Sequence, residues 1–463
     1  MDGRTPPTYR TGAGLFPRSK STTTLCVCCA LVLAGCATYT PALQHPDSFP
    51  GAYSARTLGP APANGTWTSA DLLAAALAHN PAVAAALERR RAALAAVRGV
   101  RQPGAPTLTL TAEYANAHPH WGYGAAGDFP LRLGAVRRSQ ITLAELAALQ
   151  ALYDRAEAVW TVRAALTQAQ ADLAASADLL AGAQRLEALR QQRLARIERR
   201  IALGEDDRTL GLTARAELAT SRARVRAAQA QQTQARLALA AALSVPLEAL
   251  AGLAIAPVTP PAEALADGRR DAITGRADVL RAIADYDLAE AGLRSQVARQ
   301  YPEVRLGSGY MYDHGVSKLP FNLSLALPPF DGNRSGIAQA EATRAASGRA
   351  LEAVQAGVLT RIDAADAALV SARTTEAQVR SGELSAARAL AERTARAVAA
   401  GASDRVEDLG ARALLAEAEL NLVAAQNATR QAAADLEDAL RRPFDPAEAA
   451  VLARVLSAAG AVK

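Results

Sequence analysis

Four residues near the start of the chain form a motif at which a cysteine can be modified chemically. Leu33, Ala34 and Gly35 precede Cys36, an order typical of a lipobox. The small residues allow a lipoprotein signal peptidase to approach, and the Cys36 sulfur is the atom that takes a diacylglycerol group. We therefore expect lipidation at Cys36. The alternative is an ordinary signal peptide that carries a cysteine after a small residue.

The segment before Cys36 has the features of an export signal. A basic stretch ends at Lys20, and the apolar run 22–33 that follows it is too short to span a membrane. We expect residues 1–35 to be removed as a lipoprotein signal peptide, which leaves Cys36 as the one cysteine of the mature chain. Ala37 follows without the Asp that commonly signals retention in the inner membrane, so delivery to the outer membrane is expected.

Charged side chains gather in two short segments that each follow a glycine. The first segment, after Gly204, contains Glu205, Asp206, Asp207 and Arg208, and the second, after Gly401, contains Asp404, Arg405, Glu407 and Asp408. Adjacent opposite charges can form salt bridges, and rings of carboxylates favour cations over anions. A solvated turn with ordinary helix capping is the alternative interpretation.

Other side chains carry less chemical information. Imidazoles such as those of His118, His120 and His314 suit zinc or copper. We favour the interpretation that these histidines, with Trp121, lie in plain surface loops between strands. The mature chain offers no nucleophile and base in a recognisable arrangement, no Gly-rich phosphate loop and no clustered thiols. We therefore predict no catalytic residues, no metal site and no cofactor.

The composition favours long helices and argues against nucleic-acid binding. Half of the 463 residues are apolar and only 4% are aromatic, with Ala, Leu and Arg dominant. Ala loses no side-chain entropy on entering a helix, and Leu and Arg lose little. The formal net charge is +6, but acids and bases alternate along the expected helices, as they do on solvated helix faces.

One unit of sequence occurs twice along the chain. The matches keep an offset of 196 or 197 residues and include the pairs Pro106 and Pro302, Tyr114 and Tyr310, Gly204 and Gly401, and Arg215 and Arg412. Within each unit we expect the order helix, strand, strand, long helix, turn, helix.

The helices are predicted from their breakers and caps. The first opens at Thr68 or Ser69 with Asp71 in its first turn, and Pro81 breaks it. A long helix over 138–203 spans ~100 Å at 1.5 Å per residue. It ends at Gly204, because glycine is preferred just past a helix C-terminus, and a return helix covers 209–243. In the second unit the turn at Gly332 precedes a long helix over 335–399, Gly401 follows it, and the return helix ends near Arg442.

Between these helices the apolar period changes from 3.6 residues to 2. Leu108, Leu110, Ala112 and Tyr114 alternate with Thr107, Thr109, Thr111 and Glu113, and residues 303–312 repeat the pattern. Return strands are expected at 129–133 and 321–327. Four strands with one apolar and one polar face, each of about ten residues, suit an outer-membrane barrel wall.

Four strands cannot close a barrel, and open strand edges are not tolerated in hydrocarbon. Several chains must therefore contribute to one barrel, and strand counting allows eight strands from a dimer or twelve from a trimer. A small soluble sheet docked on the helices is the alternative. If the strands cross the outer membrane, the long helices extend into the periplasm, which is the geometry of a conduit.

From residue 68 to 442 the sequence resembles the outer membrane efflux proteins related to TolC and the NodT-type lipoprotein channels. The resemblance is carried by the Gly204 and Gly401 turns and by the segments His79-Asn80-Pro81, Pro106-Thr107-Leu108-Thr109-Leu110 and Leu327-Pro328-Pro329-Phe330-Asp331-Gly332. One departure is the segment 130–138, which replaces the aromatic-Asp-Gly turn of the family and looks more like the Gly-Lys-Arg turn of its heavy-metal branch.

The resemblance implies a mostly α-helical fold with a transmembrane β part. A homotrimer would form a twelve-stranded β-barrel on a long periplasmic α-helical barrel, with a periplasmic membrane-fusion adaptor and an inner-membrane pump as partners. Related channels narrow at the hairpin tips through acidic residues and salt bridges. The gate candidates are therefore Asp207, Arg208, Asp404, Arg405, Glu407 and Asp408; Glu407 falls at one acidic gate position, while Gly410 occupies another.

These expectations divide the chain into five parts and leave two other functions to weigh. The parts are a signal peptide at 1–35, a lipid-anchor linker at 36–66, repeats at 67–255 and 256–442, and a tail at 443–463. A periplasmic adaptor or structural coiled-coil lipoprotein would also use long hairpins. An adaptor, however, usually has one hairpin flanked by Gly- and Val-rich β modules. A lipid-anchored enzyme is the other alternative, but the sequence offers no catalytic site for it.

Overall fold

The computed structural model describes residues 39–42, 45–116, 118–131, 134–256, 268–327 and 330–458. Cys36 and the expected signal peptide lie outside the described residues. The chain divides into two units, 1–53 and 54–463. At the end of the first unit, the short helix α2 (Phe49–Ser54), whose last residue belongs to the second unit, follows a 3₁₀ turn at Pro46–Ser48, and the rings of Phe49 and Tyr53 stack.

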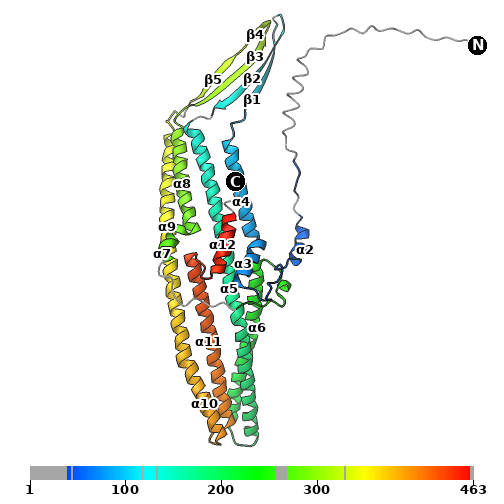
Figure 1. The fold of residues 1–463 in the computed structure, drawn as a ribbon, viewed down its shortest axis with the longest axis vertical. Helices are drawn as coiled ribbons and strands as arrows, with labels where there is room; N and C mark the ends of the chain where they lie inside the picture. Colours follow the sequence, from blue (N-terminus) through cyan, green and yellow to red (C-terminus); the bar gives the residue numbers. More distant parts are fainter. Residues whose placement is uncertain are drawn as a thin grey trace, which may run out of the picture. The chain divides into compact units, whose positions relative to one another are not determined.

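The second unit is mostly helical with one small sheet (Figure 1). Its first half contains α3 (Ser69–His79), α4 (Pro81–Arg101), β1 (Thr107–Tyr114), β2 (Trp121–Leu131), α5 (Ala135–Ala202) and α6 (Arg208–Leu243). Its second half contains α7 (Gly268–Gly275), α8 (Ala277–Ala298), β3 (Glu303–Asp313), β4 (Val316–Lys318), β5 (Phe321–Ala326), α9 (Arg334–Gln378), α10 (Ser385–Ala399), α11 (Arg405–Leu440) and α12 (Pro446–Ala458).

Helix boundaries follow the caps and breakers of the sequence. The Thr68 side chain and Asp71 form a reciprocal capping box at the start of α3. Asn80 ends α3, and its side-chain oxygen accepts hydrogen bonds from Ala82 N and Val83 N at the start of α4. Pro81 occupies the first turn of α4, where its missing N–H costs nothing. The predicted break at Pro81 is therefore present.

The two long rods differ in regularity. Helix α5 runs for 68 residues without interruption, as the sequence predicts. The second rod was expected to be uninterrupted over 335–399, and this is wrong in detail: a π-helical segment at Val379–Leu384 separates α9 from α10. The i→i+5 hydrogen bonds of a π segment widen the helix locally, and such segments often mark functional places.

The helices lie side by side in a layer, and different helices form this layer at its two ends. Toward the sheet, α5 packs against α4 and α8, and α8 packs against α9. Toward the opposite end, α5 packs against α6 and α11, and α11 packs against α9 and α10. Figure 1 shows the sheet at one end of these rods and the turns of both hairpins at the other.

The sheet has the strand order β1-β2-β3, and both β4 and β5 pair with β3; all pairs are antiparallel. The expected four strands are thus five, because the return strand of the second half is interrupted at Leu319 and Pro320. Proline has no N–H to give to the ladder. Strand β2 begins at Trp121, a residue that was expected in the preceding loop.

The core is divided into clusters along the rods. The largest joins Trp67, Trp160, Leu72 and Leu73 to Leu452 of α12, within the segment 443–463 that was expected to be a tail. A second cluster joins α7, α8, α9 and α11. Near the hairpin turns the clusters shrink to a few residues, mainly Ala and Leu. Packing therefore holds the middle of the unit more firmly than its tips.

Within the described residues, no single helix is both long and apolar enough to cross a membrane; α3 and α4 meet that criterion only when taken together, and they are bent by 56° at their junction.

Candidate functional sites: a two-faced sheet and two helix tips

The strand register gathers apolar side chains on one face of the sheet. Leu110 of β1 pairs with Ala125 of β2, which pairs with Tyr310 of β3, so these three residues share a face. The same face carries Leu108, Tyr114, Trp121, Tyr123, Phe129, Leu306, Tyr312, Phe321, Leu323 and Leu325. Leu110 is 72% exposed and Phe321 78% exposed. A patch of this kind marks contact with an apolar surrounding or a partner.

The opposite face of the sheet is polar. It carries Thr107, Thr109, Thr111, Glu113, Asp128, Arg305, Asn322 and Ser324. Arg305 and Asp128, on neighbouring strands, form an ion pair of 3.6 Å. Alternation in the sequence therefore becomes a physical separation, with an apolar and a polar surface on opposite sides of one layer of strands.

Glycines on the polar face allow close contact between strands. A Cβ atom added to Gly309 would lie 2.6 Å from the carbonyl oxygen of Ala125. One added to Gly124 would lie 2.8 Å from the Thr111 hydroxyl oxygen and 3.1 Å from the Tyr310 carbonyl oxygen. At Gly309 a larger residue would require the backbone to shift, and at Gly124 it would require the Thr111 side chain to move.

At the far end of the rods, two tight turns form the helix tips. Gly204 has a φ of +79° and Gly401 a φ of +71°, the left-handed conformation that glycine adopts without strain. Gly332, in the turn before α9, has a φ of +62°.

The predicted gate residues lie at these tips, but most of them bond within their own turn. The Asp207 carboxylate caps α6 by accepting from Thr209 N at 3.0 Å, and Asp404 caps α11 by accepting from Val406 N at 3.2 Å. Glu407 accepts from the Ser403 hydroxyl at 2.5 Å.

The remaining gate candidates differ in burial. Asp408 is buried and pairs with Arg412, one turn further along α11, at 3.0 Å. Arg208 and Arg405 are exposed, and neither forms an ion pair with a described residue. The two tips are therefore not joined through these two arginines within the described part of one chain.

Arg200, which the sequence analysis missed, joins the two tips. Its guanidinium lies 2.9 Å from an Asp206 carboxylate oxygen and 3.7 Å from Glu205 in the first turn, and it also pairs with Asp404 of the second. Arg200 lies one helical turn before Gly204, which is a signal of proximity to the tip. The sequence alone does not show which of Arg199 and Arg200 faces the other hairpin.

More ion pairs connect the same helices above the tips. Glu417 of α11 forms ion pairs with Arg190 of α5 at 3.3 Å and with Arg224 of α6 at 2.6 Å. Arg185 pairs with Glu419 at 2.8 Å. The first hairpin is basic on the side that contacts α11, and α11 supplies the acids. The two hairpins of one chain are thus held together by charge where the apolar clusters are small.

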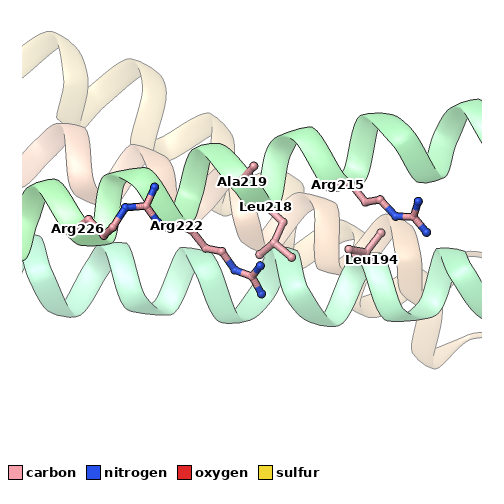
Figure 2. Close-up of a pocket in the computed structure, with 6 residues that line it drawn as sticks. All are labelled: Leu194, Arg215, Leu218, Ala219, Arg222 and Arg226. Atoms are coloured by element: carbon pink, nitrogen blue, oxygen red, sulfur yellow. The ribbon is translucent and has the colours of Figure 1, made fainter.

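A shallow groove of about 260 Å³ runs between α5 and α6. Figure 2 shows Arg215, Arg222 and Arg226 along α6, with Leu218 between the first two and Leu194 on α5 beneath. Arg215 pairs with Glu198 at 2.8 Å and Arg222 with Glu187 at 3.3 Å. The groove is therefore an ion-paired seam between two helices and not an enclosed site for a small molecule.

His118, His120 and His314 lie in the loops at the end of the sheet. The Nδ1 atom of His314 lies 2.6 Å from the Pro119 carbonyl oxygen, and the ring of His120 stacks on Tyr114. In the part of the chain that the structure describes, no group of three or more His, Cys, Asp or Glu is arranged to hold a metal ion.

This architecture is similar to that of known proteins. The model of a family described as outer membrane efflux protein matches residues 72–245 and 269–440, which is most of the chain. No curated protein sequence matches the chain.

Several solved structures share the fold. The outer membrane protein VceC of Vibrio cholerae is 17% identical, with a TM-score of 0.68 over 81% of this chain and 97% of VceC. The CmeC outer membrane channel of Campylobacter jejuni is 12% identical, with a TM-score of 0.69 over 91% and 98%. The open state of the Neisseria gonorrhoeae MtrE outer membrane channel is 20% identical, with a TM-score of 0.67 over 81% and 89%.

Proposed function

This chain belongs to the outer membrane efflux protein family, and from that premise we propose that it is the outer-membrane channel of a tripartite efflux system. Cargo would pass through it by diffusion after delivery from an inner-membrane pump and a periplasmic adaptor. The observation that carries the proposal is the two-faced sheet at one end of long helices. The apolar face suits lipid, and the polar face suits a water-filled lumen.

The sheet requires partners because its edge strands are open. In hydrocarbon every backbone N–H and C=O needs a hydrogen-bond partner, so only a closed barrel is stable there. Strands β4 and β5 are two pieces of one returning strand, which gives four strand positions in each chain. A homotrimer then closes a barrel of twelve strands, in line with the family. The two halves of each chain act as repeats that contribute two strand positions each.

The helices continue the conduit below the barrel. The layer of α4, α5, α8 and α9 changes to α6, α5, α11 and α10 toward the tips. Three such layers would form a helical barrel in the periplasm, with the hairpin tips at its narrow end. Arg200 with its three carboxylates and the exposed Glu407 are placed where such a tube would narrow.

Two features concern attachment and partners. We expect lipid at Cys36 to anchor the chain in the outer membrane in addition to the barrel, as the lipobox indicates. The adaptor and pump would approach from the tip end, which faces away from the sheet. The alternative of an adaptor or structural coiled-coil lipoprotein is not favoured, because the efflux family matches both halves of the chain.

The assembly is tested by native mass spectrometry of the purified protein in detergent. The expected species is a trimer whose subunit mass includes lipid at Cys36. A stable monomer with full strand content would refute the shared barrel, and a lipid-free trimer would refute only the anchor. Deletion of the gene, with sensitivity measured against metals, dyes and antibiotics, tests the role in efflux and identifies the class of cargo.

A further inference from the structure

Two buried arginines lie between α4 and α5 without a carboxylate beside them. Arg90 of α4 is 8% exposed, and Arg155 of α5 is 6% exposed. Arg90 shares one face of α4 with Val83, Ala86 and Val97, and this face packs against α5. A buried charge is costly unless it is paired, so two like charges at one interface need a counter-charge.

The two helices place these arginines at the same level. The last turn of α4 meets the beginning of α5, where Arg101 pairs with Glu145 at 2.6 Å, and from there the two helices run in opposite directions along one another (Figure 1). Arg90 lies about three turns before Arg101, and Arg155 lies about three turns after Glu145. The two guanidinium groups also act on one another, because burial and the nearby Arg90 charge lower the pKa of Arg155.

The carboxylates nearest to this pair in the sequence are occupied by other arginines. Glu88 of α4 pairs with Arg91. On α5, Asp154 pairs with an arginine of α8, and Glu157 pairs with the arginine that follows α11. Within the part of the chain that the structure describes, Arg90 forms no hydrogen bond or ion pair. The two arginines therefore share no acidic partner.

Arg155 has more donors than its surroundings accept. Its Nη2 atom donates to the Val455 carbonyl oxygen, in the last turn of α12, at 2.9 Å. Its Nε and Nη1 atoms are buried, and neither has a hydrogen-bond partner among the described residues. The carbonyl end of a helix is equivalent to about half a negative charge. This partial charge cannot balance two guanidinium groups, so positive charge and unused donors remain.

We propose that Arg90 and Arg155 form a binding site for a small oxyanion such as inorganic phosphate. Guanidinium groups present planar sets of N–H donors that suit the oxygens of phosphate, and a bound anion would supply both the missing charge and the missing acceptors. The Arg90 nitrogens are less enclosed than Nε and Nη1 of Arg155, so the anion enters from the Arg90 side. Once bound, it would tie α4 and α5 to the last turn of α12.

The test is the melting temperature of the purified full-length protein in detergent. It is measured in Tris-chloride buffer with added sodium phosphate, or with sodium chloride at the same ionic strength. In the wild type we expect phosphate to raise the melting temperature by several degrees, with a logarithmic dependence on concentration once the site is mostly filled. Arg90→Gln and Arg155→Gln each remove one of the two charges and should lose most of this rise. Arg89→Gln, at an exposed arginine of the same helix, is the matched control and should keep it.

The variants separate binding at this site from the general effect of phosphate. Phosphate is excluded from protein surfaces and stabilises most folded proteins, but this effect should be the same in all four proteins. Equilibrium dialysis with labelled phosphate gives a second readout, and we expect binding by the wild type and Arg89→Gln that is lost in the other two variants. Arg90→Gln leaves the hydrogen bond between Arg155 and Val455 in place, so the comparison does not depend on a variant that fails to fold.

Two results would overturn the proposal. The first is an equal rise in melting temperature in the wild type, Arg90→Gln and Arg155→Gln. The second is a wild-type protein that retains no phosphate in dialysis, which would mean that some other group neutralises the two arginines.

Discussion

The guanidinium of Arg200, on the first long helix, pairs with the carboxylate of Asp404, at the turn of the second hairpin. These residues are 204 positions apart in the chain, and their contact joins two tips near which the apolar clusters are small. Arg200 also holds Asp206 and Glu205 of its own turn. One side chain thus joins both tips within a chain, in addition to the ion pairs that Glu417 and Glu419 form further up the hairpins.

Removal of this side chain should loosen the tips. An exposed ion pair contributes only about 0.2–1 kcal/mol, but Arg200→Ala removes the partner of three carboxylates at once and leaves them to repel one another. We expect higher single-channel conductance or more frequent opening in planar bilayers, with an unchanged trimer. Arg199→Ala is the matched control, because Arg199 forms no ion pair with a described residue. Equal conductance in the two variants would contradict a gate at Arg200.

Glu407 should act on ion selectivity and not on opening. Its carboxylate is exposed, and among the described residues it accepts a hydrogen bond only from the nearby Ser403 hydroxyl. If three chains close one tube as proposed, three copies of this carboxylate around its narrow end would favour cations. Glu407→Gln is therefore expected to lower the cation-to-anion permeability ratio, measured as the reversal potential in a salt gradient. Unchanged selectivity would mean that Glu407 serves only to stabilise its turn.

The two faces of the sheet predict opposite outcomes for neighbouring substitutions on β5. Leu323 lies on the apolar face and Ser324 on the polar face. Arginine on the lipid side of a barrel costs about 2–4 kcal/mol at the middle of the membrane. Leu323→Arg should therefore reduce the amount of trimer inserted in the outer membrane, whereas Ser324→Arg should be tolerated and alter conductance. Equal insertion of both variants would show that the apolar face does not contact lipid.

An ion pair between a buried arginine and a partly exposed aspartate in the second half predicts a loss of stability in acid. The Arg276 side chain is fully buried and donates both to Asp278 and to the Ala439 carbonyl oxygen. Burial alone would raise the pKa of Asp278, but the hydrogen bonds and charge of Arg276 lower it below the ordinary value of 3.8. The stabilisation is present above that value and is lost as the pH falls through the lowered one.

The same pair predicts the effect of a substitution. Asp278→Asn leaves the Arg276 charge without its carboxylate and should cost about 1–3 kcal/mol. The loss is expected as a lower melting temperature at neutral pH and a smaller further decrease in acid than in the wild type. Glu352→Gln, on an exposed pair with Arg349, should change neither quantity. Wild-type stability of Asp278→Asn at neutral pH would contradict a stabilising role for the pair.

Local features of the structure could be predicted from the sequence. Thr68, Asn80 and Pro81 define helix ends through contacts within three residues, and the alternation after Pro106 defines the strands and their faces. These signals act between residues that are close in the chain, so they can be recognised in the amino-acid sequence alone. The separation of β4 from β5 at Pro320 also has a local cause, although β4 itself was not predicted.

Features that depend on distant partners could not be predicted in the same way. Arg163 meets Glu437 over 274 residues, and Arg200 meets Asp404 over 204. Both arginines belong to a helix rich in that residue, and nothing in their immediate neighbours distinguishes them from the arginines that face solvent. The π-helical segment at Val379–Leu384 likewise lacks proline, and the Ser381-Gly382 pair inside it is only a weak local signal of an irregular helix.

The central claim is that this chain forms an open conduit through a membrane, and conductance measures it most directly. The purified protein is reconstituted as a trimer in a planar lipid bilayer, and single-channel currents are recorded in salt solution. We expect discrete, cation-preferring channels whose conductance rises in Arg200→Ala. A correctly assembled trimer that inserts into the bilayer but passes no ions, in both the wild type and Arg200→Ala, would contradict it.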